Sequence, residues 1–94
     1  MAQFNNFIKF TEMLSDAERE LGIAHLAELD KQVLYHIQKC KTEGKTMSLE
    51  ELYQLMATPR ATLYRHVQAL VVNGTLTKQK DPDDGRRNII SVAI

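Results

Sequence analysis

The sequence predicts a mainly α-helical domain that carries one small antiparallel β-hairpin, an α+β fold. Three observations predict it. Apolar residues recur at three- and four-residue spacing in the segments before Asn73, which is helical periodicity. A helix-start signal at Thr58 and Pro59 follows a short helix after only a tight turn. Two strand-like runs, 76–79 and 88–92, then flank a charged turn. A helix, a turn, a second helix and a hairpin in this order make a winged helix-turn-helix.

The length of the chain allows one small domain with a single core. It has 94 residues, of which 44% are apolar and 26% charged, a composition typical of a folded protein. We therefore expect residues 1–94 to form a single winged-helix domain, with residues 1–22 as an extra N-terminal helical segment. No signal-peptide pattern follows Met1 and no apolar run is long enough to span a bilayer, so we expect a cytoplasmic protein without membrane contact.

The formal net charge is zero, which by itself gives no general attraction to nucleic acid. The charges are nevertheless unevenly distributed along the chain. Residues 1–57 carry six Lys and Arg against nine Asp and Glu, a balance of −3, whereas residues 58–94 carry six against three, a balance of +3. Positive charge is therefore concentrated in the half that contains the second helix of the helix-turn-helix and the hairpin.

The N-terminal segment is expected to be a helix from Phe4 to Leu21 that ends at Gly22. Ser15 and Glu18 could instead form a capping box that restarts the helix, with a break near Leu14. Two apolar stripes make this helix more apolar than one core contact requires. Either both stripes pack on this domain, or one of them meets a partner subunit. We expect a homodimer whose interface draws on Phe4, Phe7, Ile8, Phe10, Met13 and Leu14.

The next helix is expected from Glu28 to Thr42, with Gly44 after its end. Cys40 lies on its apolar stripe and is expected to be buried, because free cysteine is among the most buried residue types. Lys39 and Lys41 beside it keep a redox-sensing thiol as the alternative. With a single cysteine, no internal disulfide is possible.

The helix-turn-helix begins at Ser48, which is expected to form a capping box with Glu51, the glutamate reaching back toward it. Residues 45–47 before it are expected to be an extended link. Thr58 is expected to cap the second helix, with Pro59 at its first position. The core face of the first helix should consist of Leu49, Leu52, Leu55 and Met56.

The second helix, about Pro59 to Asn73, should bury Leu63, Val67 and Leu70, which recur at helical spacing. Its opposite face then offers guanidinium groups for guanine, an amide for adenine and hydroxyls for phosphate. The candidate DNA contacts on and before this helix are Thr58, Arg60, Ala61, Thr62, Tyr64, Arg65 and Gln68. Taken alone, such a face could equally be an ordinary solvated helix surface.

The hairpin is expected to pair Leu76–Gln79 with Asn88–Val92 and to form the wing. Asp84 precedes Arg86 by two residues, close enough to hold its guanidinium by a charge-assisted hydrogen bond. The candidate DNA contacts of the wing are Lys78, Lys80, Arg86 and Arg87. The alternative is that the acidic residues of the turn simply balance these cations in a solvated loop. Helix, turn, cap and wing agree with one another, which favours DNA binding.

The region from Leu52 to Val92 resembles the winged-helix core of the MarR-type transcriptional regulators. The resemblance lies in Thr58-Pro-Arg-Ala-Thr-Leu-Tyr-Arg-His-Val67, in Ala69-Leu70 and Gly74, and in Asp81-Pro-Asp-Asp-Gly-Arg86. It implies that the second helix enters the major groove and that the wing arginine enters the minor groove. The residues to which it assigns these roles are Arg60, Thr62, Tyr64, Arg65 and Arg86.

The sequence departs from the family pattern in two respects. Family members continue past the wing into C-terminal helices that build the dimer, whereas this sequence stops at Ile94, so a short form without that interface is expected. Val71 and Val72 stand where the family tends to have charged residues, and Thr75 where it tends to have an aliphatic one. Because the first departure removes the dimer-building helices, we carry over no small-molecule effector site from the family, and the effector stays unknown.

We therefore expect a transcriptional regulator that binds double-stranded DNA without a cofactor or a metal, and not an enzyme. No phosphate-binding glycine loop, no paired histidines at metal spacing and no base beside the cysteine are present. The acidic turn lacks the glycine and glutamate register of a calcium loop. The alternatives are a winged helix that serves as a protein-interaction module, or an antagonist of a longer relative.

Overall fold

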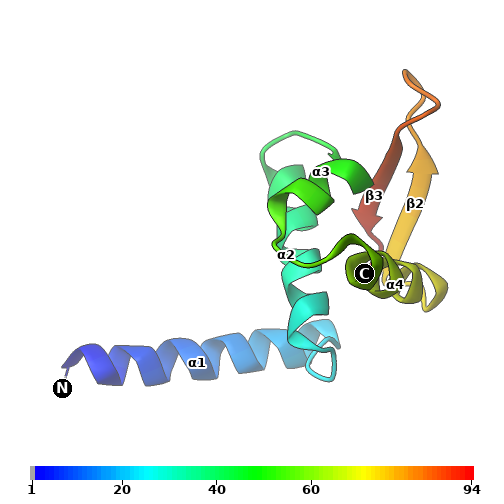
Figure 1. Cartoon of the computed structure of the whole chain (residues 1–94). Helices are drawn as coiled ribbons and strands as arrows, with labels where there is room; N and C mark the ends of the chain where they lie inside the picture. Colours follow the sequence, from blue (N-terminus) through cyan, green and yellow to red (C-terminus); the bar gives the residue numbers. More distant parts are fainter. Residues whose placement is uncertain (1) are drawn as a thin grey trace.

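The computed structural model describes residues 2–94 and confirms the mainly helical winged-helix architecture (Figure 1). The expected helix over residues 28–42 has the expected bounds. The elements in chain order are α1 (Ala2–Leu21), α2 (Glu28–Thr42), β1 (Met47–Ser48), α3 (Leu49–Leu55), α4 (Arg60–Val72), β2 (Leu76–Lys80) and β3 (Asn88–Val92).

The sheet has three antiparallel strands in the order β1-β3-β2. The predicted hairpin is confirmed, with Leu76 paired to Val92 at its base and Lys80 paired to Asn88 near the tip. The first strand was missed, since residues 45–47 were expected to be only an extended link. Met47 instead pairs with Ile90 of β3. Two residues are too few to show the alternation that predicts a strand.

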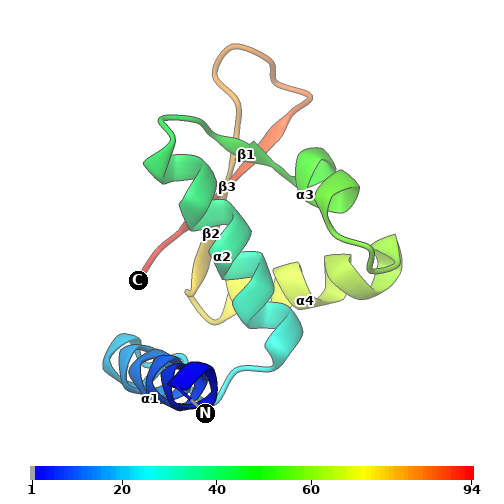
Figure 2. The ribbon, with the colours of Figure 1, turned by 90° about the vertical axis from the view of Figure 1, so that its left-hand side faces the viewer.

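The core lies between α2, α3, α4 and the inner face of the sheet (Figure 2). Leu63, Val67 and Leu70 of α4 are buried as predicted. Leu55 was assigned to the core wrongly, because 58% of it is exposed. The buried hydrophobic residues are Val33, Leu34, Ile37, Met47, Leu52, Met56, Leu63, Val67, Leu70, Leu76 and Ile90. Helix α3 ends at Leu55, and the extended backbone of Met56 turns its side chain inward one turn after Leu52.

The start of α4 also differs from the prediction. Pro59, not Thr58, occupies the N-cap position, and no side chain caps the helix. Pro59 has an extended ψ of 140°, so its carbonyl oxygen accepts the first helical hydrogen bond, from the N–H of Leu63 at 3.0 Å. Thr58 therefore lies in the turn, and the helix begins one residue later than expected.

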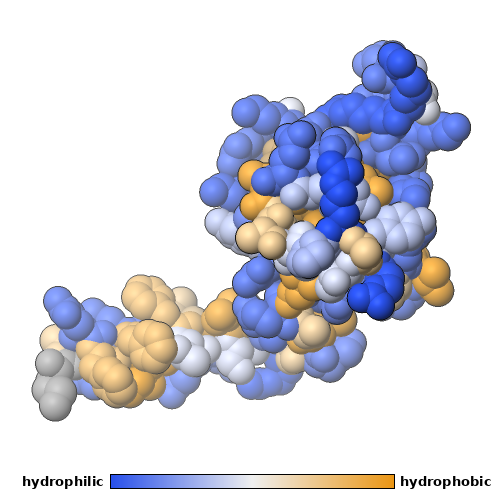
Figure 3. Space-filling view, viewed as in Figure 1, coloured by the Kyte–Doolittle hydropathy of each residue, from blue (hydrophilic) through white to orange (hydrophobic). Residues whose placement is uncertain are grey.

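Helix α1 is unbroken from Ala2 to Leu21, so the alternative break near Leu14 is wrong. None of its residues is buried. The helix projects from the body of the domain, and Figure 3 shows apolar side chains gathered along this arm. Near its end, the Lys31 ammonium group donates to the Glu18 carboxylate at 2.7 Å. This ion pair links the C-terminal end of α1 to α2.

Gly74 ends α4 with a φ of +84°, in the left-handed region, and a Cβ there would meet nothing within 4 Å. Gly74→Ala should lower the free energy of unfolding by about 1 to 2 kcal/mol. Alanine is strained in the left-handed region, and its added Cβ would make no contact that offsets this cost. Urea denaturation measures this change in the free energy of unfolding. The matched control is Gly85→Ala, since Gly85 has equally open surroundings without a φ in that region. Equal losses in the two variants would contradict this explanation.

Candidate nucleic-acid interface

The outer face of α4 carries most of the side chains that the sequence singled out. Arg60, Ala61, Tyr64 and Arg65 are exposed. Thr58, Thr62 and Gln68 are partly buried. The Gln68 amide donates a hydrogen bond to the Tyr64 hydroxyl at 2.7 Å, so these two side chains are held together one helical turn apart. The face is therefore polar and presents both donors and acceptors.

Arg60 is bound to α3 across the turn. Its guanidinium donates to both carboxylate oxygens of Glu50, with one distance of 3.1 Å, and lies 4.9 Å from the centre of the Tyr53 ring. Glu50 raises the pKa of the Arg60 guanidinium above its ordinary value. By contrast, Arg65 makes no ion pair with any residue among 2–94. The two arginines are thus in different electrostatic states, although both are solvent-accessible.

The wing presents Arg86 almost entirely to solvent, with 96% of its side chain exposed. The Asp84 carboxylate accepts the backbone N–H of Arg86 at 3.1 Å and lies 3.6 Å from its Nε. The guanidinium contact is thus an ion pair, too long for the hydrogen bond that we expected. Lys78 and Lys80 are exposed on β2. The role of Asp84 in positioning Arg86 stays a prediction.

Arg87 differs from its neighbour, because only 32% of its side chain is exposed. It forms ion pairs with Asp81, at 3.0 Å, and with Glu51 of α3. Sequence reasoning grouped Arg87 with the free cations of the wing. Glu51 and Arg87 lie 36 residues apart, so no local pattern could reveal their contact.

The carboxyl groups of this cluster are held in their charged form. The hydrogen bond from Arg87 is the main reason why the pKa of Glu51 lies below its ordinary value. The pKa of Asp81 is lowered first by the backbone N–H of Asp83 and then by Arg87. A lowered carboxyl pKa contributes stability above the unfolded-state pKa, which is lost as the pH falls through the folded-state value. The cluster is therefore intact at neutral pH.

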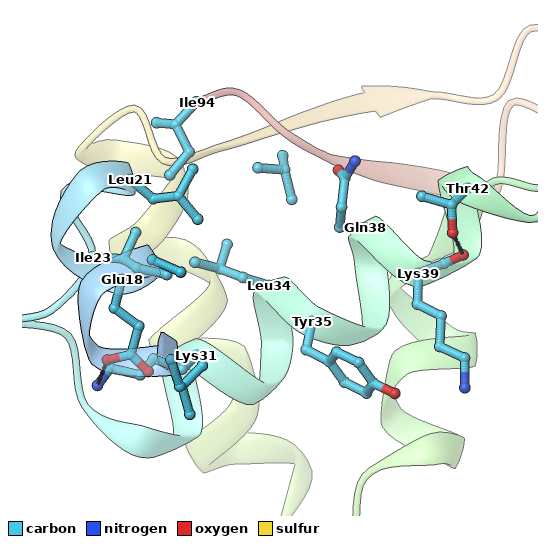
Figure 4. Close-up of a pocket in the computed structure, with 13 residues that line it drawn as sticks. Glu18, Leu21, Ile23, Lys31, Leu34, Tyr35, Gln38, Lys39, Thr42 and Ile94 are labelled. Carbon is cyan, nitrogen blue, oxygen red and sulfur yellow. Dashed lines mark hydrogen bonds and ion pairs between the residues drawn. The ribbon is translucent and has the colours of Figure 1, made fainter. Parts of the chain in front are cut away.

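The six apolar residues proposed for a dimer interface are all exposed along α1. A pocket of about 620 Å³, which the sequence did not reveal, opens between α1, α2 and the end of the chain that follows β3. Figure 4 shows Leu21, Ile23, Leu34 and Ile94 around it, with the Glu18–Lys31 ion pair at one side. The pocket continues the apolar surface of α1 onto the body of the domain.

Among residues 2–94, no group of three or more His, Cys, Asp or Glu side chains could hold a metal ion. Within the same part of the chain, no helix has both the length and the apolar character needed to cross a membrane. Cys40 is partly buried and forms no disulfide.

Comparison of the fold with solved structures gives several matches among transcriptional regulators. A point mutant of S. aureus MepR bound to an oligodeoxyribonucleotide has a TM-score of 0.66 at 14% identity, over 98% of this chain and 65% of that one. Wild-type E. coli MarR in its apo form has a TM-score of 0.65 at 18% identity, over 94% and 64%. A probable transcriptional regulator from Pseudomonas aeruginosa has a TM-score of 0.61 at 24% identity, over 95% and 65%.

These matches rest on structure and not on sequence. No model of a protein family matches the chain, and no curated protein has a matching sequence. The chain spans slightly less than two thirds of the length of the three solved structures. The similarity establishes the fold: the described helices and the three-stranded sheet follow the winged-helix arrangement of these regulators.

Proposed function

We propose that this chain, which has the MarR-type winged-helix fold, is a transcriptional regulator that binds double-stranded DNA sequence-specifically. One observation carries the proposal. The exposed polar face of α4 and the exposed Arg86 belong to the helix and the wing of one winged-helix unit. Both lie in residues 58–94, the part of the chain with an excess of positive charge. A structural neighbour bound to an oligodeoxyribonucleotide supports the assignment.

In the proposed complex, α4 enters the major groove. The side chains of Arg60, Arg65 and Gln68 then reach base edges, where a guanidinium matches guanine and an amide matches adenine. Tyr64 is held by Gln68 and so presents its hydroxyl to the phosphate backbone at a fixed position. Arg86 extends from the wing into the neighbouring minor groove or onto its backbone.

Salt dependence tests the proposal without knowledge of the operator. Titration of a fluorescent duplex of mixed sequence should give an affinity that falls steeply as salt rises, because phosphate contacts release counterions. Arg86→Ala should reduce the slope of log affinity against log salt by about 0.9. Binding that is absent at low salt, or that does not change with salt, would contradict the proposal.

We further infer that two copies associate through α1, since a helix with this many exposed aromatic and aliphatic side chains favours an interface. The charge pattern of the helix favours an antiparallel pair. In its first half, residues 2–10, the one charged residue is Lys9. The second half, residues 11–21, has four acidic residues and one basic residue, Arg19. An antiparallel arrangement brings the basic half of one copy against the acidic half of the other, and it also opposes the two helix dipoles.

Phe7→Glu together with Leu14→Glu should convert the dimer into a monomer, because both side chains are exposed on the apolar stripe and a buried carboxylate is costly. Neither residue contributes to the core, so the fold should persist. Sedimentation velocity at micromolar concentration measures the change. Asn5→Glu is the control, because it adds a carboxylate on the opposite side of α1. A wild-type protein that sediments as a monomer would refute the inference.

A further inference from the structure

Arg86 and Arg87 are adjacent at the end of the wing loop, but they are in contrasting environments. The side chain of Arg86 is 96% exposed and that of Arg87 is 32% exposed. Arg87 directly precedes Asn88, the first residue of β3. It therefore lies where the wing loop joins the sheet, whereas the side chain of Arg86 is surrounded almost entirely by solvent.

Within the wing, two hydrogen bonds between Asp81 and Arg87 close the base of the loop. The backbone N–H of Asp81 donates to the carbonyl oxygen of Arg87 at 2.8 Å. The Arg87 guanidinium in turn donates to the Asp81 carboxylate at 3.0 Å, and the side chain of Asp81 is only 12% exposed. The position of the guanidinium is thus fixed relative to the hairpin.

The same guanidinium also reaches out of the wing to Glu51, in the first turn of α3. The Glu51 carboxylate is itself held, because it accepts a hydrogen bond from the Ser48 hydroxyl at 3.0 Å. The Ser48 hydroxyl in turn accepts the backbone N–H of Glu51 at 3.1 Å. Ser48 is buried and pairs with Ile89 of β3. Glu51 is therefore a fixed acceptor, and Arg87 links it to the wing.

We propose that Glu51 and Arg87 form a clasp that sets the orientation of the wing relative to the helix-turn-helix, so that Arg87 is a positioning residue and Arg86 is the DNA-contacting cation. This inference rests on the proposed function. The guanidinium of Arg87 already has two carboxylate partners, and a phosphate would have to displace one of them. The clasp connects the wing to α3, the helix that directly precedes α4 in the helix-turn-helix.

The effect of the clasp on the orientation of the wing can be tested without DNA. Spin labels are attached through Gln54→Cys on α3 and Asp83→Cys on the wing loop, both exposed positions, in a Cys40→Ser background. Glu51→Gln and Arg87→Met should each broaden the distribution of distances between the labels. Glu51→Gln keeps the shape of the side chain and its capping contacts with Ser48, so this variant should fold. An unchanged distribution in both variants would overturn the proposal.

The role in DNA binding is tested by whether Glu51→Gln weakens or tightens the binding of DNA. If Arg87 positions the wing, Glu51→Gln should weaken DNA binding by at least about threefold, as Arg87→Met does, and the double variant should be no weaker than Arg87→Met alone. If Arg87 instead contacts DNA, Glu51→Gln would free it and tighten binding, while Arg87→Met would still weaken binding. That second pattern would overturn the proposal.

Glu50→Gln is the matched control, since Glu50 is the neighbouring residue and also pairs with an arginine. This substitution should leave the label distances unchanged. It should also tighten DNA binding, because it releases Arg60 and removes an exposed negative charge beside the proposed reading face. If the wild-type protein fails to bind DNA at all, the proposed function fails, while the label distances still decide whether the clasp exists.

Discussion

Arg60→Ala combined with Arg65→Ala is expected to lower the affinity for a preferred duplex by about 100-fold, because each well-placed contact to a base edge provides roughly tenfold discrimination or more. Both side chains are exposed near the start of α4, where a groove-bound helix makes its base contacts. The affinity for duplex of mixed sequence should fall much less, since it depends on the total phosphate contacts. Competition titrations with the two kinds of duplex at one salt concentration measure both effects.

The control for the Arg60 and Arg65 double variant removes two positive charges from other parts of the surface. Arg19→Ala with Lys39→Ala takes two positive charges from exposed positions on α1 and α2, which have no part in the proposed DNA-contacting face. It should lower affinity for both duplexes slightly and equally. A preference between duplexes that survives in the Arg60 and Arg65 double variant would show that these arginines do not read sequence.

Leu63→Ala is expected to lower the free energy of unfolding by about 2 to 5 kcal/mol, the range for leucine truncation in a packed core. Leu63 has no exposed surface, and it lies in the cluster where α4 meets α2, α3 and the sheet. For a domain of this size, such a loss is a large share of the total stability. Urea denaturation followed by circular dichroism gives the value.

Leu55→Ala is the matched control, because it deletes the same atoms from a side chain that is 58% exposed. Its effect should stay within about 0.5 kcal/mol. Comparable losses in the two variants would mean that Leu55 packs in the core after all, as its spacing from Leu52 suggested.

The sequence predicted those parts of the fold that local signals determine. The bounds of α2 follow from its long apolar periodicity, and the position of the hairpin follows from the turn residues between its strands. The short elements were harder to predict. Strand β1 has two residues, and its existence depends on pairing with Ile90, far along the chain. Thr58 and Pro59 compete for one cap position, and the extended backbone of Pro59 decides the outcome.

The candidate site was predictable to the extent that it follows from helical geometry. Once Leu63 and Val67 face the core, Tyr64 and Arg65 must face outward. What the sequence did not show is the partner of each arginine. Arg60 pairs with Glu50 across ten residues, and Arg87 pairs with Glu51 across 36. Such pairs form only when the fold brings the first helix of the motif beside its turn and its wing.

The most direct test of sequence-specific DNA binding is selection of the intact protein against a pool of randomised duplexes, followed by sequencing of the bound fraction. A homodimeric regulator should enrich an inverted repeat whose half-site centres lie about 34 Å apart, one helical turn of DNA. A pool that remains unenriched after repeated rounds would contradict sequence-specific recognition. The exposed apolar surface of α1 would then become the main candidate for function, as a contact site for another protein.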